Sequence, residues 1–192
     1  MKQLSLLAFL LVLLVSACGD DDDDGDLLFD RIARIGRADG WRLASVDSDF
    51  DARVNAAIDG LTDEQIAADT RTRDDLRQQY SPFIRAATTV DECDRDDILF
   101  FVQNGAMRII GGDVECPVGG DPSPILRFND RTYTTDGTAS ELTVRASSGE
   151  LTGVYEIFDL TDEQFNFGTE VEVQDSIFTD LTYSIRYNLV AN

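Results

Sequence analysis

Two segments near the end of the chain alternate between apolar and polar residues, and this alternation constrains the fold more than any other feature. In residues 165–173, the residues on the drier side are Phe165, Phe167, Thr169, Val171 and Val173. In residues 181–189, they are Leu181, Tyr183, Ile185, Tyr187 and Leu189. Successive side chains of a β-strand point to opposite faces, so each segment predicts a strand with one dry and one wet face.

A β-hairpin is predicted in the middle of the chain. Apolar runs at 98–102 and 106–110 flank the pair Asn104-Gly105, which is typical of a tight turn between antiparallel strands. Further short strands are predicted at 41–46, 125–128, 132–135, 141–145 and 153–160. The sequence therefore predicts a mainly β fold, an antiparallel up-and-down barrel of about eight strands, because closing the meander removes its edges.

Helical patterns precede the hairpin. A short helix is predicted over 27–35, and a helical insertion over about 50–88 follows the first strand. Thr62 and Gln65 fit a capping box, whereas Ser81-Pro82 predicts a break and a new helix start. The residues of the insertion at helical spacing are Leu76, Tyr80, Phe83, Ile84 and Ala87. This stripe is predicted to pack against the barrel or, alternatively, to cover a barrel mouth.

The first 26 residues have the pattern of an export signal and a tether. Lys2 and the apolar residues 4–15 form a signal-like segment, and Val15-Ser16-Ala17-Cys18 resembles the lipobox of bacterial lipoproteins. The resemblance implies removal of residues 1–17 and acylation of Cys18; an ordinary secretory peptide is the alternative. Residues 18–26 are then a lipidated Cys and an acidic, extended tether, and residues 27–192 are the folded domain.

Cys93 and Cys116 are the two cysteines left when Cys18 is set aside. They lie just outside the two strands of the hairpin, which brings them together, and an exported chain permits a disulfide. A Cys93–Cys116 disulfide is therefore predicted, with two buried free thiols as the alternative.

The charge composition excludes several classes of function. The chain has 37 Asp and Glu against 16 Lys and Arg, no His, and Lys2 as its single Lys. The lack of His removes the commonest general base and metal ligand, and the acidic balance argues against nucleic acid. We expect no enzyme, no cofactor and no metal; Asp47, Asp49 and Asp51 predict a turn rather than a weak cation site. The excess of Asp, with Arg in place of Lys, suggests adaptation to high salt, although a GC-rich genome would also favour Arg.

Three motifs resemble one family. They are Gly40-Trp41-x-Leu43, Cys93-x-x-Asp96-Asp97-Ile98 before the Asn-Gly hairpin, and Tyr155-Glu-Ile157-x-x-Leu160-Thr161 before Phe165-x-Phe167. In this order they resemble the lipocalin-like lipoprotein domains of Bacteroidetes and related bacteria, over about residues 40–192. The acidic stretch after Cys18 is similar to that of surface-exposed lipoproteins in such bacteria, which implies the outer membrane, although a plain spacer is the alternative. In lipocalins an Arg of the last strand packs on the first-strand Trp, which implies stacking of Arg186 on Trp41; a solvated Arg186 is the alternative.

The resemblance implies a cell-envelope lipoprotein, expected to be a monomer, that binds a small apolar ligand in the barrel. The candidate lining residues are Trp41, Tyr155, Ile157, Phe165, Phe167, Tyr183 and Tyr187. The alternative is a surface interaction or structural lipoprotein in which these side chains fill the core and no small molecule binds.

Overall fold

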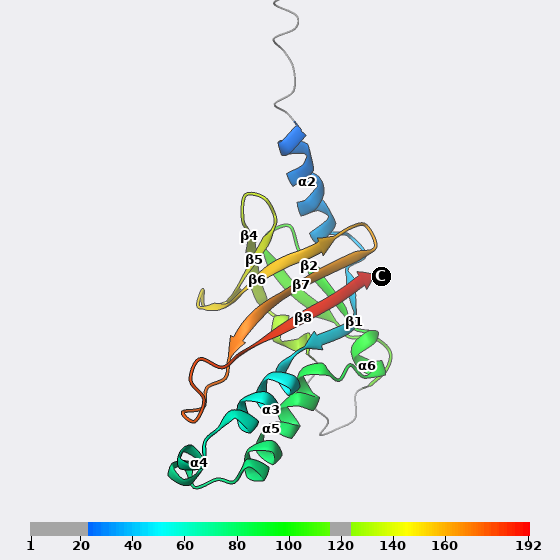
Figure 1. Cartoon of the computed structure of the whole chain (residues 1–192). Coiled ribbons are helices and arrows are strands. Elements are labelled where there is room, and N and C mark those ends of the chain that lie inside the picture. Colours follow the sequence, from blue (N-terminus) through cyan, green and yellow to red (C-terminus); the bar gives the residue numbers. More distant parts are fainter. Residues whose placement is uncertain (1–22, 116–123) are drawn as a thin grey trace, which may run out of the picture.

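The computed structural model describes residues 23–115 and 124–192, with the side chains of residues 23–27 and 83–88 left out. Its eight strands form a closed antiparallel barrel in chain order, as predicted (Figure 1). The strands are β1 (Trp41–Ser48), β2 (Ile98–Phe101), β3 (Ala106–Ile110), β4 (Arg131–Thr135), β5 (Glu141–Ala146), β6 (Leu151–Leu160), β7 (Gln164–Glu172) and β8 (Thr182–Ala191). Because β8 also pairs with β1, the barrel has no free edge.

The two alternating segments are the longest continuous pair in the barrel. Phe165 pairs with Leu189, and Phe167 pairs with Tyr187, and all four side chains are buried. Glu170, which the alternation places on the wet face of β7, is exposed. The predicted faces of β7 and β8 are therefore confirmed.

The predicted hairpin is also confirmed. β2 pairs with β3 from Ile98 opposite Ile110 to Phe101 opposite Met107. Gly105 has a φ of +82°, a conformation that glycine adopts without a steric penalty. The side chain of Asn104 accepts a hydrogen bond from the N–H of Ala106 at 3.1 Å.

Residues 125–128 are not a strand, contrary to the prediction. They contain the 3₁₀ helix η1 (Leu126–Phe128), and the N–H of Phe128 donates to the carbonyl of Ile125 at 2.9 Å. Ile125 and Phe128 are both buried. Side chains three residues apart point the same way in a 3₁₀ turn, whereas in a strand they would point to opposite faces, so the turn is the conformation that buries both.

The helical insertion lies at one end of the barrel (Figure 1). It consists of α3 (Phe50–Gly60), α4 (Asp63–Asp69), α5 (Arg73–Thr88) and α6 (Glu92–Arg95). Thr62 and Gln65 form the predicted capping box. The predicted break at Ser81-Pro82 is wrong because α5 continues through Pro82; proline removes one backbone hydrogen bond there without ending the helix.

The insertion has a small core of its own. Its buried side chains are Phe50, Val54, Ile58, Leu61, Leu76 and Tyr80. Partly buried residues of the β7–β8 connection, including Val173 and Phe178, pack against this core. Leu76 and Tyr80 lie on one buried face of α5, but they pack in this separate core rather than against the barrel core as predicted. The side chains of Phe83, Ile84 and Ala87 lie outside the described residues.

Helix α2 (Asp23–Ile35) lies at the opposite end of the barrel (Figure 1). Arg31 donates to the carbonyl of Ala139 at 2.9 Å, and Arg34 pairs with Asp162 at 2.8 Å, so α2 is fixed to two of the turns at that end. The extended tether predicted for residues 18–26 is wrong for residues 23–26, which are helical. Carboxylates in the first turn stabilise a helix N-terminus. Residues 1–22, including Cys18, lie outside the described residues.

Candidate functional site

Most of the aromatic residues predicted to line the barrel form one core inside it. Trp41, Tyr155, Phe167 and Tyr187 are at most 4% exposed. The ring centroids of Tyr155 and Phe167 are 5.6 Å apart, and those of Phe167 and Tyr187 are 5.4 Å apart. These are the distances of aromatic rings in direct contact, so these side chains pack against one another.

A ring that the sequence did not predict completes this core. Phe128 of η1 is 1% exposed, and its ring lies 5.1 Å from Tyr187, 5.5 Å from Phe167 and 5.6 Å from Tyr155. It occupies the position at which a ligand in contact with these three rings would sit. The only sequence signal for it was the apolar pair at positions 125 and 128.

Trp41 is not stacked with Arg186, contrary to what the family resemblance implied. The indole N–H of Trp41 donates to the carbonyl of Ile35 at 3.0 Å, and the guanidinium of Arg37 lies 4.9 Å from its ring centroid. Arg186 lies outside the barrel, 4.0 Å from the ring centroid of Phe158. The alternation of β8 places Arg186 on the wet face, so it cannot reach a buried indole.

Tyr183 differs from the other predicted contacts because it lies at the junction of the two cores. It is partly buried, and its ring centroid is 4.6 Å from that of Phe50 in α3. Burial raises its pKa, so the phenol is protonated at neutral pH. Tyr183 therefore joins the helical insertion to the barrel.

An arginine of η1 that is exposed overall reaches the edge of the core beside Tyr187. Nη1 of Arg127 donates to the hydroxyl of Tyr187 at 2.7 Å. Burial raises the pKa of Tyr187 to about 12, although the guanidinium of Arg127 opposes this shift. Burial also raises the pKa of Tyr155. The described contacts of Arg127 include no carboxylate, so this end of the core has one guanidinium and neutral phenols.

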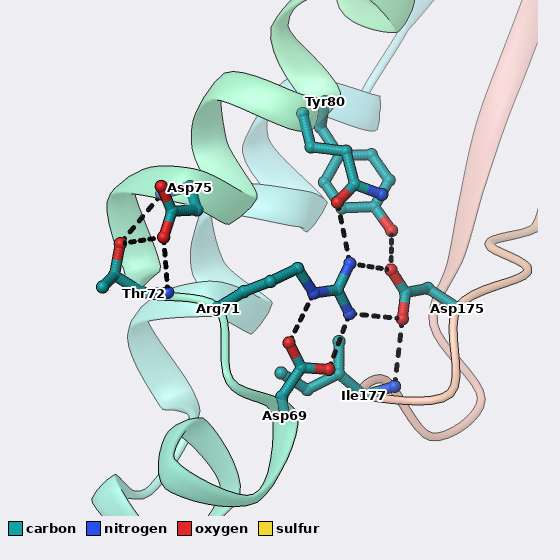
Figure 2. Close-up of polar contacts among 8 residues, drawn as sticks. Asp69, Arg71, Thr72, Asp75, Tyr80, Asp175 and Ile177 are labelled. Carbon is teal, nitrogen blue, oxygen red and sulfur yellow. Dashed lines mark hydrogen bonds and ion pairs between the residues drawn. The ribbon is translucent and has the colours of Figure 1, made fainter.

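Figure 2 shows the most extensive polar contacts between the insertion and the barrel, centred on Arg71. Arg71 binds both oxygens of Asp69, which precedes it closely in the chain, and both oxygens of Asp175 in the β7–β8 connection, the latter at 2.9 and 3.0 Å. It also donates to Gln79 at 2.7 Å. The five N–H groups of the guanidinium therefore all have acceptors.

Asp175 is equally well bonded. Besides Arg71, it accepts hydrogen bonds from the hydroxyl of Tyr80 at 2.7 Å and the N–H of Ile177 at 3.2 Å. The Arg71 hydrogen bonds hold the pKa of Asp175 at about 2 despite partial burial, and the bond from Tyr80 acts in the same direction. The polar atoms of Asp69, Arg71 and Asp175 are thus paired with one another and with Tyr80, which gives this group of residues a structural role.

The acidic residues of the predicted motif and turn accept hydrogen bonds from backbone N–H groups. Asp96 accepts from the N–H of Val114 at 2.7 Å, and Asp97 from that of Gly112 at 3.1 Å. Asp49 lies in the turn between β1 and α3 and accepts from the N–H of Ser184 at 2.7 Å. Within the described part of the chain, no three His, Cys, Asp or Glu side chains are placed to hold a metal ion.

Cys93 in α6 is buried and disulfide-bonded. Cys116 lies outside the described residues, as Cys18 does. The Cys93–Cys116 pairing therefore stays a prediction, which free-thiol titration of the denatured, non-reduced protein tests.

The outer wall of the barrel bears a groove of 820 Å³ over β5 to β8 and the end of β1. Its floor includes Val154, Phe158 and Gly168, and 39% of Val154 and 44% of Phe158 are exposed. Its charged lining residues are Asp47, Asp49, Glu141, Glu156, Glu170 and Arg186. The groove was not predicted from the sequence, because the candidate site residues all lie on the dry faces of the strands and the groove lies on the wet faces.

Comparison with known proteins gives no further identification. No family model, no curated protein and no solved structure matches the chain. Among the helices of the described residues, none has both the length and the apolar character that a membrane span requires.

Proposed function

We propose that this chain is a lipid-anchored protein of the bacterial cell envelope that acts through its outer surface. The observation that carries this proposal is the aromatic core, in which Phe128 packs against Tyr155, Phe167 and Tyr187. Protein interiors are close-packed, so a ligand among these rings would have to displace a side chain. The barrel is then a rigid scaffold for its surface.

The anchor and the location are inferred from the sequence. The lipobox-like Val15–Cys18 and the acidic run after it support acylation of Cys18 and display on the outer membrane. Attachment through more than one acyl chain gives stable membrane binding. Replacing Cys18 with Ser should release the protein from membranes; membrane retention of a signal-cleaved variant would contradict the anchor.

The filled core is tested by native mass spectrometry of the full-length protein purified from its own host. We expect the mass of the processed, acylated chain with no further small molecule. The variant Phe128→Ala, which opens space between three rings, should bind an apolar dye that the wild type does not bind. A small molecule copurifying with the wild type in equal amount would overturn the proposal.

A second candidate is binding of a small anionic ligand beside Arg127. It is favoured by the contacts of Arg127 among the described residues, which include the phenol of Tyr187 and no carboxylate, in a chain of net charge −21. If this function holds, an anionic molecule should copurify with the wild type, and the substitution Arg127→Met should abolish its binding. The substitution Arg77→Met, on the exposed face of α5, is the matched control.

A further inference from the structure

We propose that the outer groove binds a basic, extended segment of a partner protein, with an apolar residue between its Lys or Arg side chains. This inference rests on the proposed surface function and names the surface and the chemistry of its partner. It follows from the row of residues that crosses the groove, from the floor beneath them, and from the charge of the two sides of the barrel.

One row of paired residues crosses five neighbouring strands. Glu141 of β5 pairs with Glu156 of β6, and Glu156 pairs with Gly168 of β7. Gly168 pairs with Arg186 of β8, and Arg186 pairs with Asp47 of β1. The row therefore has three carboxylates, one guanidinium, and a glycine at its centre.

Two of these carboxylates face each other without compensation. Glu141 and Glu156 are directly opposite on adjacent strands and exposed, an arrangement that destabilises a sheet. Among the described residues, no cation pairs with either side chain. Elsewhere in the groove, Asp49 pairs with Arg53 at 2.9 Å, and Arg53 lies within electrostatic range of Glu170. A cation between Glu141 and Glu156 would remove their repulsion.

The floor between the charges is apolar because of Gly168. A Cβ at this position would meet the ring of Phe158 at 3.1 Å and the carbonyl oxygen of Ile185. Without a side chain there, Phe158 lies over β7, with Arg186 4.0 Å from its ring centroid. Arg186 therefore stacks on the ring rather than pairing with Asp47, which shows that this floor accommodates a guanidinium.

Negative charge is concentrated on the groove side of the barrel, in addition to the acidic balance of the whole chain. Strands β6 and β7 contain Glu156, Asp159, Glu170 and Glu172 and no Lys or Arg. Strands β2, β3 and β4, across the barrel, contain Arg108 and Arg131 and no Asp or Glu. A basic partner is therefore attracted to one side of the barrel, which gives orientation as well as attraction.

The closed barrel also restricts the binding mode. On the groove side, each strand from β5 to β8 is paired with both of its neighbours, so a peptide cannot add to the sheet there as a further strand. Recognition must then use side chains. Five strands at about 4.8 Å spacing span roughly 19 Å, which an extended peptide crosses in about six residues.

The test is a calorimetric titration of the full-length protein with an amidated hexapeptide that alternates arginine and leucine, in about 0.1 M NaCl. We expect Phe158→Ser to weaken binding about tenfold and Glu156→Gln about threefold, as for the loss of one apolar contact and one exposed ion pair. Glu163→Gln, an exposed carboxylate in the β6–β7 turn outside the groove, should leave the affinity unchanged. Glu141→Gln should weaken binding yet raise the melting temperature, because it removes the repulsion from Glu156; a merely structural effect would not combine these changes.

Three results would overturn the proposal. These are absence of peptide binding, equal sensitivity to Glu156→Gln and Glu163→Gln, and equal binding of spermine and of the peptide, which would indicate only attraction of counter-ions. Self-association of the protein through the groove in place of peptide binding would instead make a second copy of the chain the occupant. A copurified barrel ligand would contradict the proposed function but leave this titration intact, so the two failures are distinguishable.

Discussion

The barrel and the helical insertion each bury apolar side chains, but they are held together by different means. The barrel is closed by strand pairing around its whole circumference. Its core consists of aromatic rings from several strands that contact one another. The insertion buries six side chains, and its polar contacts with the β7–β8 connection converge on Asp175, which binds Arg71 and Tyr80. The comparison teaches that loss of one core ring should affect the whole fold, whereas loss of Arg71 should affect one end of it.

The largest effect is expected from Phe167→Ala. Phe167 is fully buried and contacts rings from β2, β6, β8 and η1, and such a deletion costs about 3–5 kcal/mol. Urea unfolding followed by the fluorescence of Trp41, the single Trp of the chain, measures it. The control is Phe158→Ala, at an exposed ring, which should cost about 1 kcal/mol or less. Equal losses would show that the exposed outer face of the barrel contributes as much stability as its aromatic core, contrary to the role given to the core rings.

A smaller and more local effect is expected from Arg71→Met. It leaves Asp175, whose side chain is 10% exposed, without its cation, at a cost of about 1.5–3 kcal/mol. Hydrogen exchange should accelerate in α4, α5 and the β7–β8 connection and stay slow in β2 and β3. Arg71→Lys, which keeps the charge but not the fork, should recover only part of the loss.

The control for this variant is Arg77→Met. The side chain of Arg77 is 40% exposed and pairs with Asp74 and Asp59. Exposed ion pairs contribute about 0–1 kcal/mol, so exchange should change little. Accelerated exchange throughout the barrel in Arg71→Met would mean that the two cores unfold as one unit.

Acid should separate the two regions further. The pKa of Asp175 is about 2 in the fold, below its usual value of 3.8, so the folded state binds this proton less tightly than the unfolded state does. The stabilisation, about 2.5 kcal/mol at most, is complete above about pH 4 and is lost as the pH falls towards 2. Asp175→Asn should abolish this part of the acid sensitivity of the insertion. If wild type and variant lose protection in parallel, Asp175 does not control the acid response.

Salt should have the smallest effect on stability, and it should stabilise the barrel, whereas the substitutions and acid described above destabilise the protein. The repulsion between Glu141 and Glu156 and of the whole acidic surface weakens as the Debye length falls from about 10 Å at 0.1 M to about 3 Å at 1 M. A gain of about 1 kcal/mol would raise the melting temperature by about 2–4 °C. The melting temperature followed by Trp41 fluorescence from low to molar NaCl measures this. The rise should be smaller in Glu141→Gln, and a flat curve would contradict adaptation to high salt.

The strands could be predicted because their signals are local. The alternation in β7 and β8 and the Asn104-Gly105 turn need only neighbouring residues, and both were confirmed. The same alternation placed Arg186 outside, against the role that the family resemblance gave it. The sequence reading of a strand at 125–128 failed because two apolar residues three positions apart fit a 3₁₀ turn as well as an irregular strand.

The polar arrangements could not be predicted because they join distant residues. Arg71 and Asp175 are 104 positions apart, and nothing in either neighbourhood indicates the other. The groove likewise depends on register: Glu141 and Glu156 face each other only because β5 and β6 pair at that position. Composition indicated an acidic surface without indicating which carboxylates would be adjacent.

The helix α2 and the C-terminus share one end of the barrel, and this has a practical consequence. The N–H and side-chain amide of Asn192 bond to the carbonyls of Gly40 and Asp39, which follow α2. With an anchor at Cys18, as proposed, the C-terminus is then on the membrane side, and the helical insertion points away from it (Figure 1). An epitope fused after Asn192 would face the membrane, whereas one presented on the surface of α4, which has no buried residues, would face away from it.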